Sequence, residues 1–206
     1  MDPYLTKYTY DLRRAAQTME EIGYTKRSDG YLYDAAGRKL GVSIYGPTQN
    51  DIHAKTMPPI ADMWQKLGVA TEQVPIPPQR ISDRQFRAEY PSFELVERRN
   101  SLKVAEIWRL HGSQVPLPEN RFTSPGHRYQ HPEMDAALER YVTTIPSKER
   151  VQALGAAMRH MTENLSHLPI FHGADATLVS NRLLNITARG DFFTQAWNVQ
   201  EWDLKN

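Results

Sequence analysis

Between residues 39 and 97 the sequence alternates short apolar stretches with segments of helical periodicity, and this order restricts the fold more than any other feature. The expected strands are 39–45, 71–74 and 93–97, separated by expected helices at 51–67 and 82–90. A strand, a helix and a second strand in this order form a right-handed crossover, which makes the two strands parallel. The sequence therefore predicts an α/β fold with a mainly parallel sheet and helices on both of its faces.

Two prolines complicate the helix at 51–67. Apolar residues recur there at helical spacing, and Gly68 is expected to end the helix. A proline inside a helix removes a hydrogen bond and clashes one turn back, whereas the first turn tolerates it. We therefore expect the regular helix to begin near Pro58, after a looser turn over residues 51–56.

Local signals mark the other helices. Asp11 is a good N-cap for a helix over residues 11–23, and Ser82 with Gln85 forms a capping box for the helix through Tyr90. Two more helices are expected at 132–144 and 147–165, the second with a stripe of methionine and leucine that we interpret as core. Short strands are expected at 169–172 and 177–179, before a tail without clear periodicity.

Composition excludes several functional classes. The formal net charge is +1, and the basic residues are scattered, so no nucleic-acid partner is expected. The chain has no cysteine, which rules out disulfides, thiolate zinc sites and a thiol nucleophile. The start, MDPYLTKYTYD, lacks the pattern of a signal peptide, so this chain by itself is not expected to be exported or anchored.

No catalytic, cofactor or metal site is predicted. There is no GxSxG motif, phosphate-binding loop or dinucleotide fingerprint. His127 with His131, and His160 with His167, are near neighbours in sequence, but the first pair brackets a loop and no HExxH pattern exists. We interpret these histidines as surface residues or as satisfied side chains.

The candidate ligand-binding residues follow the strand at 93–97, because α/β sheets bind ligands beyond the carboxyl ends of their strands. They are Arg98, Arg99, Asn100 and Ser101. The guanidinium groups can hold a carboxylate in bidentate fashion, or both can be solvated loop residues. Trp108, in the long segment 99–132, is either a binding platform or a hydrophobic plug under that segment.

Four stretches resemble the last part of the family 5 extracellular solute-binding proteins, the class of oligopeptide- and dipeptide-binding proteins of ABC importers. They are YTYDLRRAAQTMEEIGY, IADMWQKLGV, YQHPEMDAALERY and VQEWD. The likeness runs from about Tyr8 to Asp203. It implies one lobe of a two-lobe fold, the periplasmic-binding-protein type II-like fold. Residues 1–181 would form the carboxy-terminal ligand-binding lobe, and residues 182–206 would cross back to an amino-terminal lobe that this chain lacks.

The resemblance also carries expectations for function. It implies a solute-binding component of an ABC importer, not an enzyme, located in the periplasm or at the cell surface, with the permease as partner. Where similar peptide binders often carry a Gly-Trp and an acidic residue, this chain has Arg98 to Ser101, which favours a ligand with an acidic or polar group. The alternative is a small stand-alone α/β enzyme or sensor domain that uses the same cleft.

The tail carries a further expectation. Its apolar side chains, without the other lobe, would fold back on their own lobe or pack against a second copy to give a homodimer.

Overall fold

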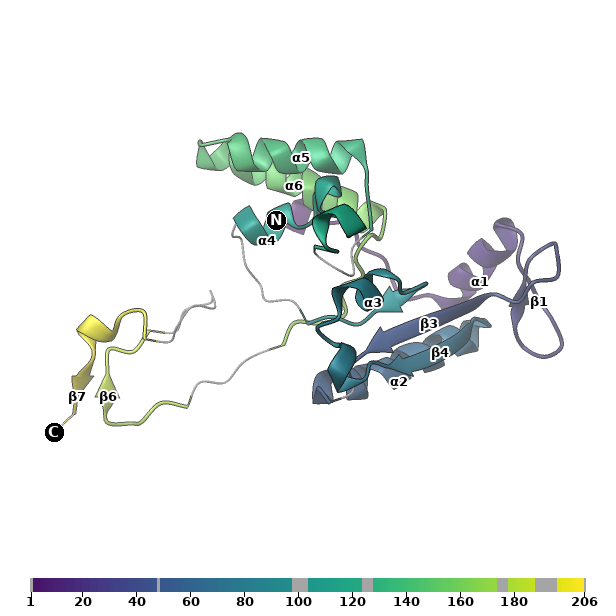
Figure 1. Ribbon diagram of the computed structural model, residues 1–206, viewed down its shortest axis with the longest axis horizontal. Helices are drawn as coiled ribbons and strands as arrows, with labels where there is room; N and C mark the ends of the chain where they lie inside the picture. Colours follow the sequence, from purple (N-terminus) through teal and green to yellow (C-terminus); the bar gives the residue numbers. More distant parts are fainter. Residues whose placement is uncertain are drawn as a thin grey trace.

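The computed structural model describes residues 2–47, 49–97, 104–123, 128–173, 178–187 and 196–205. Figure 1 shows a small sheet with a long helix along it, a pair of helices above, and a two-stranded ribbon that stands apart near the carboxyl terminus. Among the described residues no helix is long and apolar enough to cross a membrane.

The central sheet is parallel throughout. Its strands are β3 (Gly41–Gly46), β4 (Ala70–Pro75) and β5 (Phe93–Glu94), in the spatial order β4-β3-β5. Ile44 in the middle strand pairs with Gln73 on one side and Phe93 on the other. The α/β class and the parallel pairing predicted from the alternation are confirmed, although β5 is shorter than the expected strand at 93–97.

Helix α2 (Asp51–Leu67) connects β3 to β4 and contains both prolines. The expectation that it begins near Pro58 is wrong. The helix begins at Asp51, because the side chain of Asn50 accepts the N–H of Ile52 at 2.9 Å and caps its first turn. Met57 and Ala61 are buried against Ile44, and this packing offsets the hydrogen bonds that the prolines remove.

The amino-terminal helix follows its local signals. Helix α1 (Leu12–Glu21) is capped by Asp11, and Gly23 follows it with φ +96°. β1 (Thr25–Lys26) and β2 (Leu32–Tyr33) then form an antiparallel pair. An isolated antiparallel bridge between Tyr33 and Lys39 follows this pair.

Helix α3 (Arg84–Ala88) is capped by Asp83 instead of the expected Ser82. The Asp83 carboxylate accepts the N–H of Phe86 at 3.0 Å. A carboxylate at a helix N-terminus also interacts favourably with the helix dipole, which a neutral serine does not.

Two antiparallel helices form the second layer, with the largest hydrophobic cluster of the described residues between them. They are α5 (Pro132–Thr143) and α6 (Ser147–Glu163), close to the expected spans. Leu138 is 0 % exposed at the centre of this core. Leu154, Met158 and Met161 of the predicted stripe contribute to it, whereas Val151 is exposed. At the amino terminus, η1 (Asp2–Tyr4) lies against α6.

The expected loop at 99–132 contains short helical turns where it is described. These are α4 (Val104–Trp108), η3 (Gly112–Gln114) and η4 (Pro118–Asn120), while η2 (Pro78–Arg80) lies earlier, between β4 and α3. The strands expected at 169–172 and 177–179 do not form at residues 169–172 or 178–179, and residue 177 lies outside the described part.

The described part of the tail is a small unit with its own buried residue. β6 (Leu183–Leu184) pairs with β7 (Asp203–Leu204), and η5 (Val199–Glu201) precedes β7. Asn198 is 0 % exposed. It donates to the carbonyl of Asn185 at 2.8 Å and accepts the indole N–H of Trp202 at 2.9 Å.

Candidate functional site

The carboxyl ends of the three parallel strands meet at one edge of the sheet, where an α/β fold binds its ligands. The ladder continues one residue beyond β4 and β5. The N–H of Ile76 donates to the carbonyl of Gly46, and the N–H of Leu95 donates to the carbonyl of Tyr45. These bonds fix where the chain leaves the sheet, and therefore which residues face the edge.

The first turn of α2 brings His53 to this edge. A Cβ added to Gly46 would lie 2.6 Å from the Met57 methyl group and 3.9 Å from the His53 Cβ, so the helix approaches the strand end closely. His53 is buried, and neither of its ring nitrogens has a hydrogen-bond partner among the described residues. A buried imidazole without partners is unfavourable by itself and is chemically equipped to donate to, or accept from, a bound polar group.

A cluster of three aromatic side chains borders the same edge of the sheet. Tyr45 on β3 stacks on Tyr90, and Phe86 of α3 meets Tyr90 edge to face with ring centroids 5.2 Å apart. Arg87 pairs with Glu94 at 2.8 Å. Burial, with a smaller contribution from the charge of Glu94, raises the pKa of Tyr90 to about 12. Tyr90 is therefore neutral at physiological pH.

Of the predicted ligand residues, Arg98, Arg99, Asn100 and Ser101 lie outside the described residues. Trp108 ends α4, and its half-buried ring stacks on His111 with centroids 4.2 Å apart and planes 12° from parallel. His111 is itself held by the Ser113 hydroxyl at 2.8 Å. One face of Trp108 is thus covered by protein, and a role in ligand binding stays a prediction.

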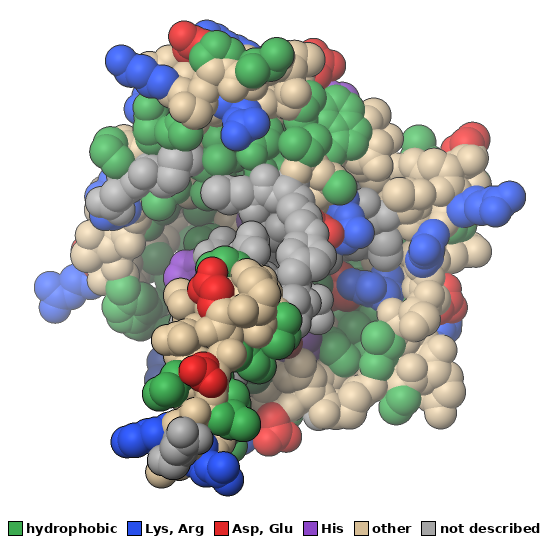
Figure 2. Space-filling view, turned by 90° about the vertical axis from the view of Figure 1, so that its left-hand side faces the viewer, with side chains coloured by type: hydrophobic (Ala, Val, Ile, Leu, Met, Phe, Trp, Pro, Cys, Tyr) green, Lys and Arg blue, Asp and Glu red, His purple; other side chains and the backbone are tan. Residues whose placement is uncertain are grey.

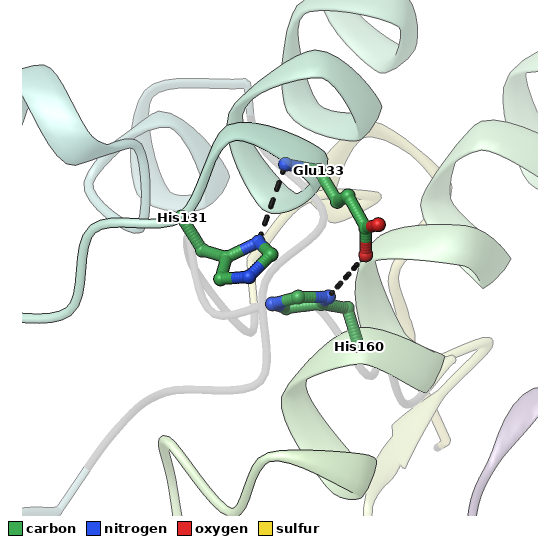
Figure 3. Close-up of side chains that lie close together, drawn as sticks. All are labelled: His131, Glu133 and His160. Carbon is green, nitrogen blue, oxygen red and sulfur yellow. Dashed lines mark hydrogen bonds and ion pairs between the residues drawn. The ribbon is translucent and has the colours of Figure 1, made fainter.

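A second group of side chains, His131, Glu133 and His160, was not predicted to converge. One possible ligand atom from each lies within 4.8 Å of the others, as Figure 3 shows. From the sequence, His127 and His131, and His160 and His167, are interpreted as surface or satisfied residues, whereas the structure brings His131 and His160 together. The expected helices at 132–144 and 147–165 carried a signal for this meeting. Two antiparallel helices joined by a short loop place the start of the first, at His131, beside the end of the second, near His160.

A shallow hollow opens beside this group. Its volume is about 320 Å³, and Glu133, Arg159 and His160 are among the residues that line it, together with Tyr4 of η1. The side chain of Glu133 is 80 % exposed, whereas that of His160 is 9 % exposed. The group is therefore open to solvent on the side of Glu133.

No family model matches the sequence, and no curated protein matches it either. Solved structures do match. NikZ from Campylobacter jejuni, solved in complex with Ni(L-His), matches 96% of this chain with a TM-score of 0.72 and 18% identity. The oligopeptide-binding protein AppA from Bacillus subtilis, solved with a nonapeptide, matches 98% of this chain with a TM-score of 0.66 and 13% identity.

A third match is a periplasmic oligopeptide-binding protein of an ABC transporter from Thermotoga maritima, solved with bound mannohexaose. It covers 79% of this chain with a TM-score of 0.65 and 17% identity. This chain spans 40%, 39% and 31% of the three matched chains, less than half of each. At these identities the likeness establishes the fold: the chain has the fold of one portion of these binding proteins, and the predicted resemblance is confirmed at that level.

Proposed function

We propose that the chain is the carboxy-terminal ligand-binding lobe of a family 5 solute-binding protein that serves an ABC importer. The observation that carries this proposal is the structural match over nearly the whole chain to NikZ, solved in complex with Ni(L-His), and to the oligopeptide-binding protein AppA, solved with a nonapeptide. Residues 1–181 form the lobe, and residues 182–206 cross to an amino-terminal lobe. The separation of the β6-β7 ribbon from the sheet and helices in Figure 1 supports that division.

The lobe binds its solute without chemical conversion. The ligand lies at the carboxyl edge of the β4-β3-β5 sheet, and two lobes close on it about a hinge. Arg98 and Arg99 hold a carboxylate or another acidic group, Asn100 and Ser101 supply hydrogen bonds, and Trp108 offers a flat apolar surface. In the cell the protein works in the periplasm or at the cell surface and delivers the solute to a permease.

Because one lobe leaves half of a ligand in water, the isolated chain binds weakly. Enclosed sites normally bury about 70 to 90% of a small ligand. A short peptide with a free carboxylate, trialanine, should therefore bind the labelled chain with a dissociation constant of roughly a millimolar, a free energy of about −4 kcal/mol. Amide shifts in a titration should concentrate at Gly46, Ile76 and Leu95.

A double variant, Arg98→Ala with Arg99→Ala, should abolish those shifts. Arg13→Ala, on the exposed face of α1, is the matched control and should leave them unchanged. Tight binding to the isolated chain, or conversion of the peptide, would favour the stand-alone enzyme or sensor instead. Shifts on another face of the molecule would remove the sheet edge as the binding site.

A further inference from the structure

We propose that His131, Glu133 and His160 form a binding site for a divalent transition-metal ion. The site lies at the open end of the α5-α6 pair, on elements other than the β4-β3-β5 edge, and it does not depend on the proposed function. Two imidazoles with one carboxylate are a ligand set that suits zinc, nickel and copper, and that magnesium and calcium do not prefer.

The fold brings the three side chains together from two helix ends. His131 is the N-cap of α5, and Glu133 lies in its first turn. His160 lies in the last turn of α6. Residues 144–146 join the antiparallel helices at the other end, so the first turn of α5 faces the last turn of α6. Figure 3 shows the two imidazole rings and the carboxylate turned toward one another.

The distances between the ligand atoms suit a tetrahedrally coordinated ion. Ligand atoms about 2.1 Å from such an ion lie roughly 3.4 Å from each other. The Glu133 Oε2 and the His160 Nδ1 are already 3.5 Å apart. His131 can complete the set after its ring moves, because one of its nitrogens lies within 4.8 Å of a ligand atom of Glu133 and of one of His160.

The surroundings orient His160 as they would a metal ligand. The Tyr129 hydroxyl lies 2.7 Å from the His160 Nε2 and can accept its proton, which leaves Nδ1 free for the ion beside Glu133. A hydrogen bond on the second ring nitrogen is the usual support for a histidine ligand. His160 is almost fully buried, so its ring orientation is fixed before an ion arrives.

His131 makes one competing interaction. Its Nδ1 accepts the N–H of Glu133 in a long, 3.3 Å capping bond. Coordination through Nε2 places a proton on Nδ1 and gives up that bond. Arg159 lines the same hollow and repels a cation. Both effects limit the affinity, so we expect micromolar binding. The exposed side of Glu133 leaves a coordination position for water.

The test uses the full chain, with Zn²⁺ as the probe in calorimetry and Co²⁺ as the spectroscopic probe. One Zn²⁺ per chain should bind, Mg²⁺ should not, and Co²⁺ should give the absorption of a tetrahedral site. His131→Asn removes a ligand but keeps a good N-cap, and it should weaken binding at least tenfold. Glu133→Gln should do the same. Tyr129→Phe should weaken it about 10- to 100-fold, as loss of support for a ligand does.

His172→Gln is the matched control, because His172 is exposed and lies outside the three-residue group. It should bind Zn²⁺ as the parent chain does. A circular dichroism spectrum and melting temperature for His131→Asn establish that α5 still forms. The proposal is overturned if the parent chain binds no Zn²⁺, if His131→Asn binds it equally well, or if His172→Gln abolishes binding.

Discussion

The rings of Tyr45 and Tyr90 stack with their centroids 4.1 Å apart and their planes 14° from parallel. Tyr45 belongs to the central strand, and Tyr90 follows the crossover helix α3, so the stack joins strand and crossover beside the proposed ligand edge. The backbone carbonyl of Tyr90 accepts a hydrogen bond from Arg128 at 2.7 Å, which adds the segment before α5 to the same contact.

Replacing Tyr90 by phenylalanine should stabilise the chain slightly. The Tyr90 hydroxyl is buried without a hydrogen-bond partner among the described residues, and an unpaired buried polar group is destabilising by about 1 to 3 kcal/mol. Tyr90→Phe removes the hydroxyl and keeps the stack, so the free energy of unfolding in urea should rise by about 1 kcal/mol. Tyr90→Ala, which removes the ring, should lower it by about 3 to 5 kcal/mol. A loss of stability in Tyr90→Phe would mean that the hydroxyl has a partner.

The same residue should make stability depend on alkaline pH. Burial raises the pKa of Tyr90 from 10.0 to about 12 in the folded chain. Between these values the unfolded chain binds fewer protons than the folded chain, so the free energy of unfolding falls as pH rises. The decline begins near pH 10, where Tyr90 in the unfolded chain loses its proton, and levels off above pH 12, where the folded chain has lost it as well. Urea titrations at several pH values should show a shallower decline in Tyr90→Phe; identical declines would exclude Tyr90 as the cause.

Gly155 of α6 should be required for the contact with the amino terminus. A Cβ at this position would lie 2.6 Å from the Tyr4 ring. Alanine improves helix propensity by about 1 kcal/mol, but the steric overlap opposes it by about 1 to 3 kcal/mol. Gly155→Ala should therefore lower the melting temperature of the parent chain and raise it in a Tyr4→Ala background. Equal effects in the two backgrounds would show that Tyr4 does not pack there.

Local signals were sufficient for much of the fold. Asp11 caps α1 as predicted, because a cap depends on residues near in sequence. The parallel strands followed from the order strand, helix, strand, because such a crossover has one handedness. The start of α2 could not be read locally, since burial of Met57 and Ala61 against the sheet outweighs the unfavourable prolines. Residues 169–172 have strand-like composition, but a strand forms only where another strand accepts its hydrogen bonds.

Of the candidate sites, one could be located from the sequence, whereas the others depend on tertiary packing. The strand-end edge follows from topology, so its position was predictable before any contact was known. The meeting of His131 with His160 depends on the tertiary pairing of two helix ends, which distance along the sequence does not reveal. His53 gave no sequence signal, because its burial results from the approach of α2 to Gly46.

The tail should mediate self-association of the isolated chain. One of the two expected arrangements, folding back on the lobe, is not what the structure has: the β6-β7 ribbon stands away from the sheet and helices in Figure 1, and it extends toward the viewer in Figure 2. In the tail, Leu184, Val199 and Leu204 are 41%, 55% and 58% exposed. Burying each large apolar side chain contributes about 1.5 to 3 kcal/mol, so a second copy that covers several of them gains enough to pair.

Light scattering of the 206-residue chain should therefore give the mass of a dimer at high concentration. A deletion that ends at Val179 should be monomeric, because it removes both strands of the ribbon and keeps the α5-α6 core. Leu204→Asn leaves the ribbon intact but makes its exposed side polar, and it should weaken the dimer without changing the melting temperature of the monomer. If the full chain is monomeric and the deletion is equally soluble and stable, the exposed side chains of the tail do not drive association.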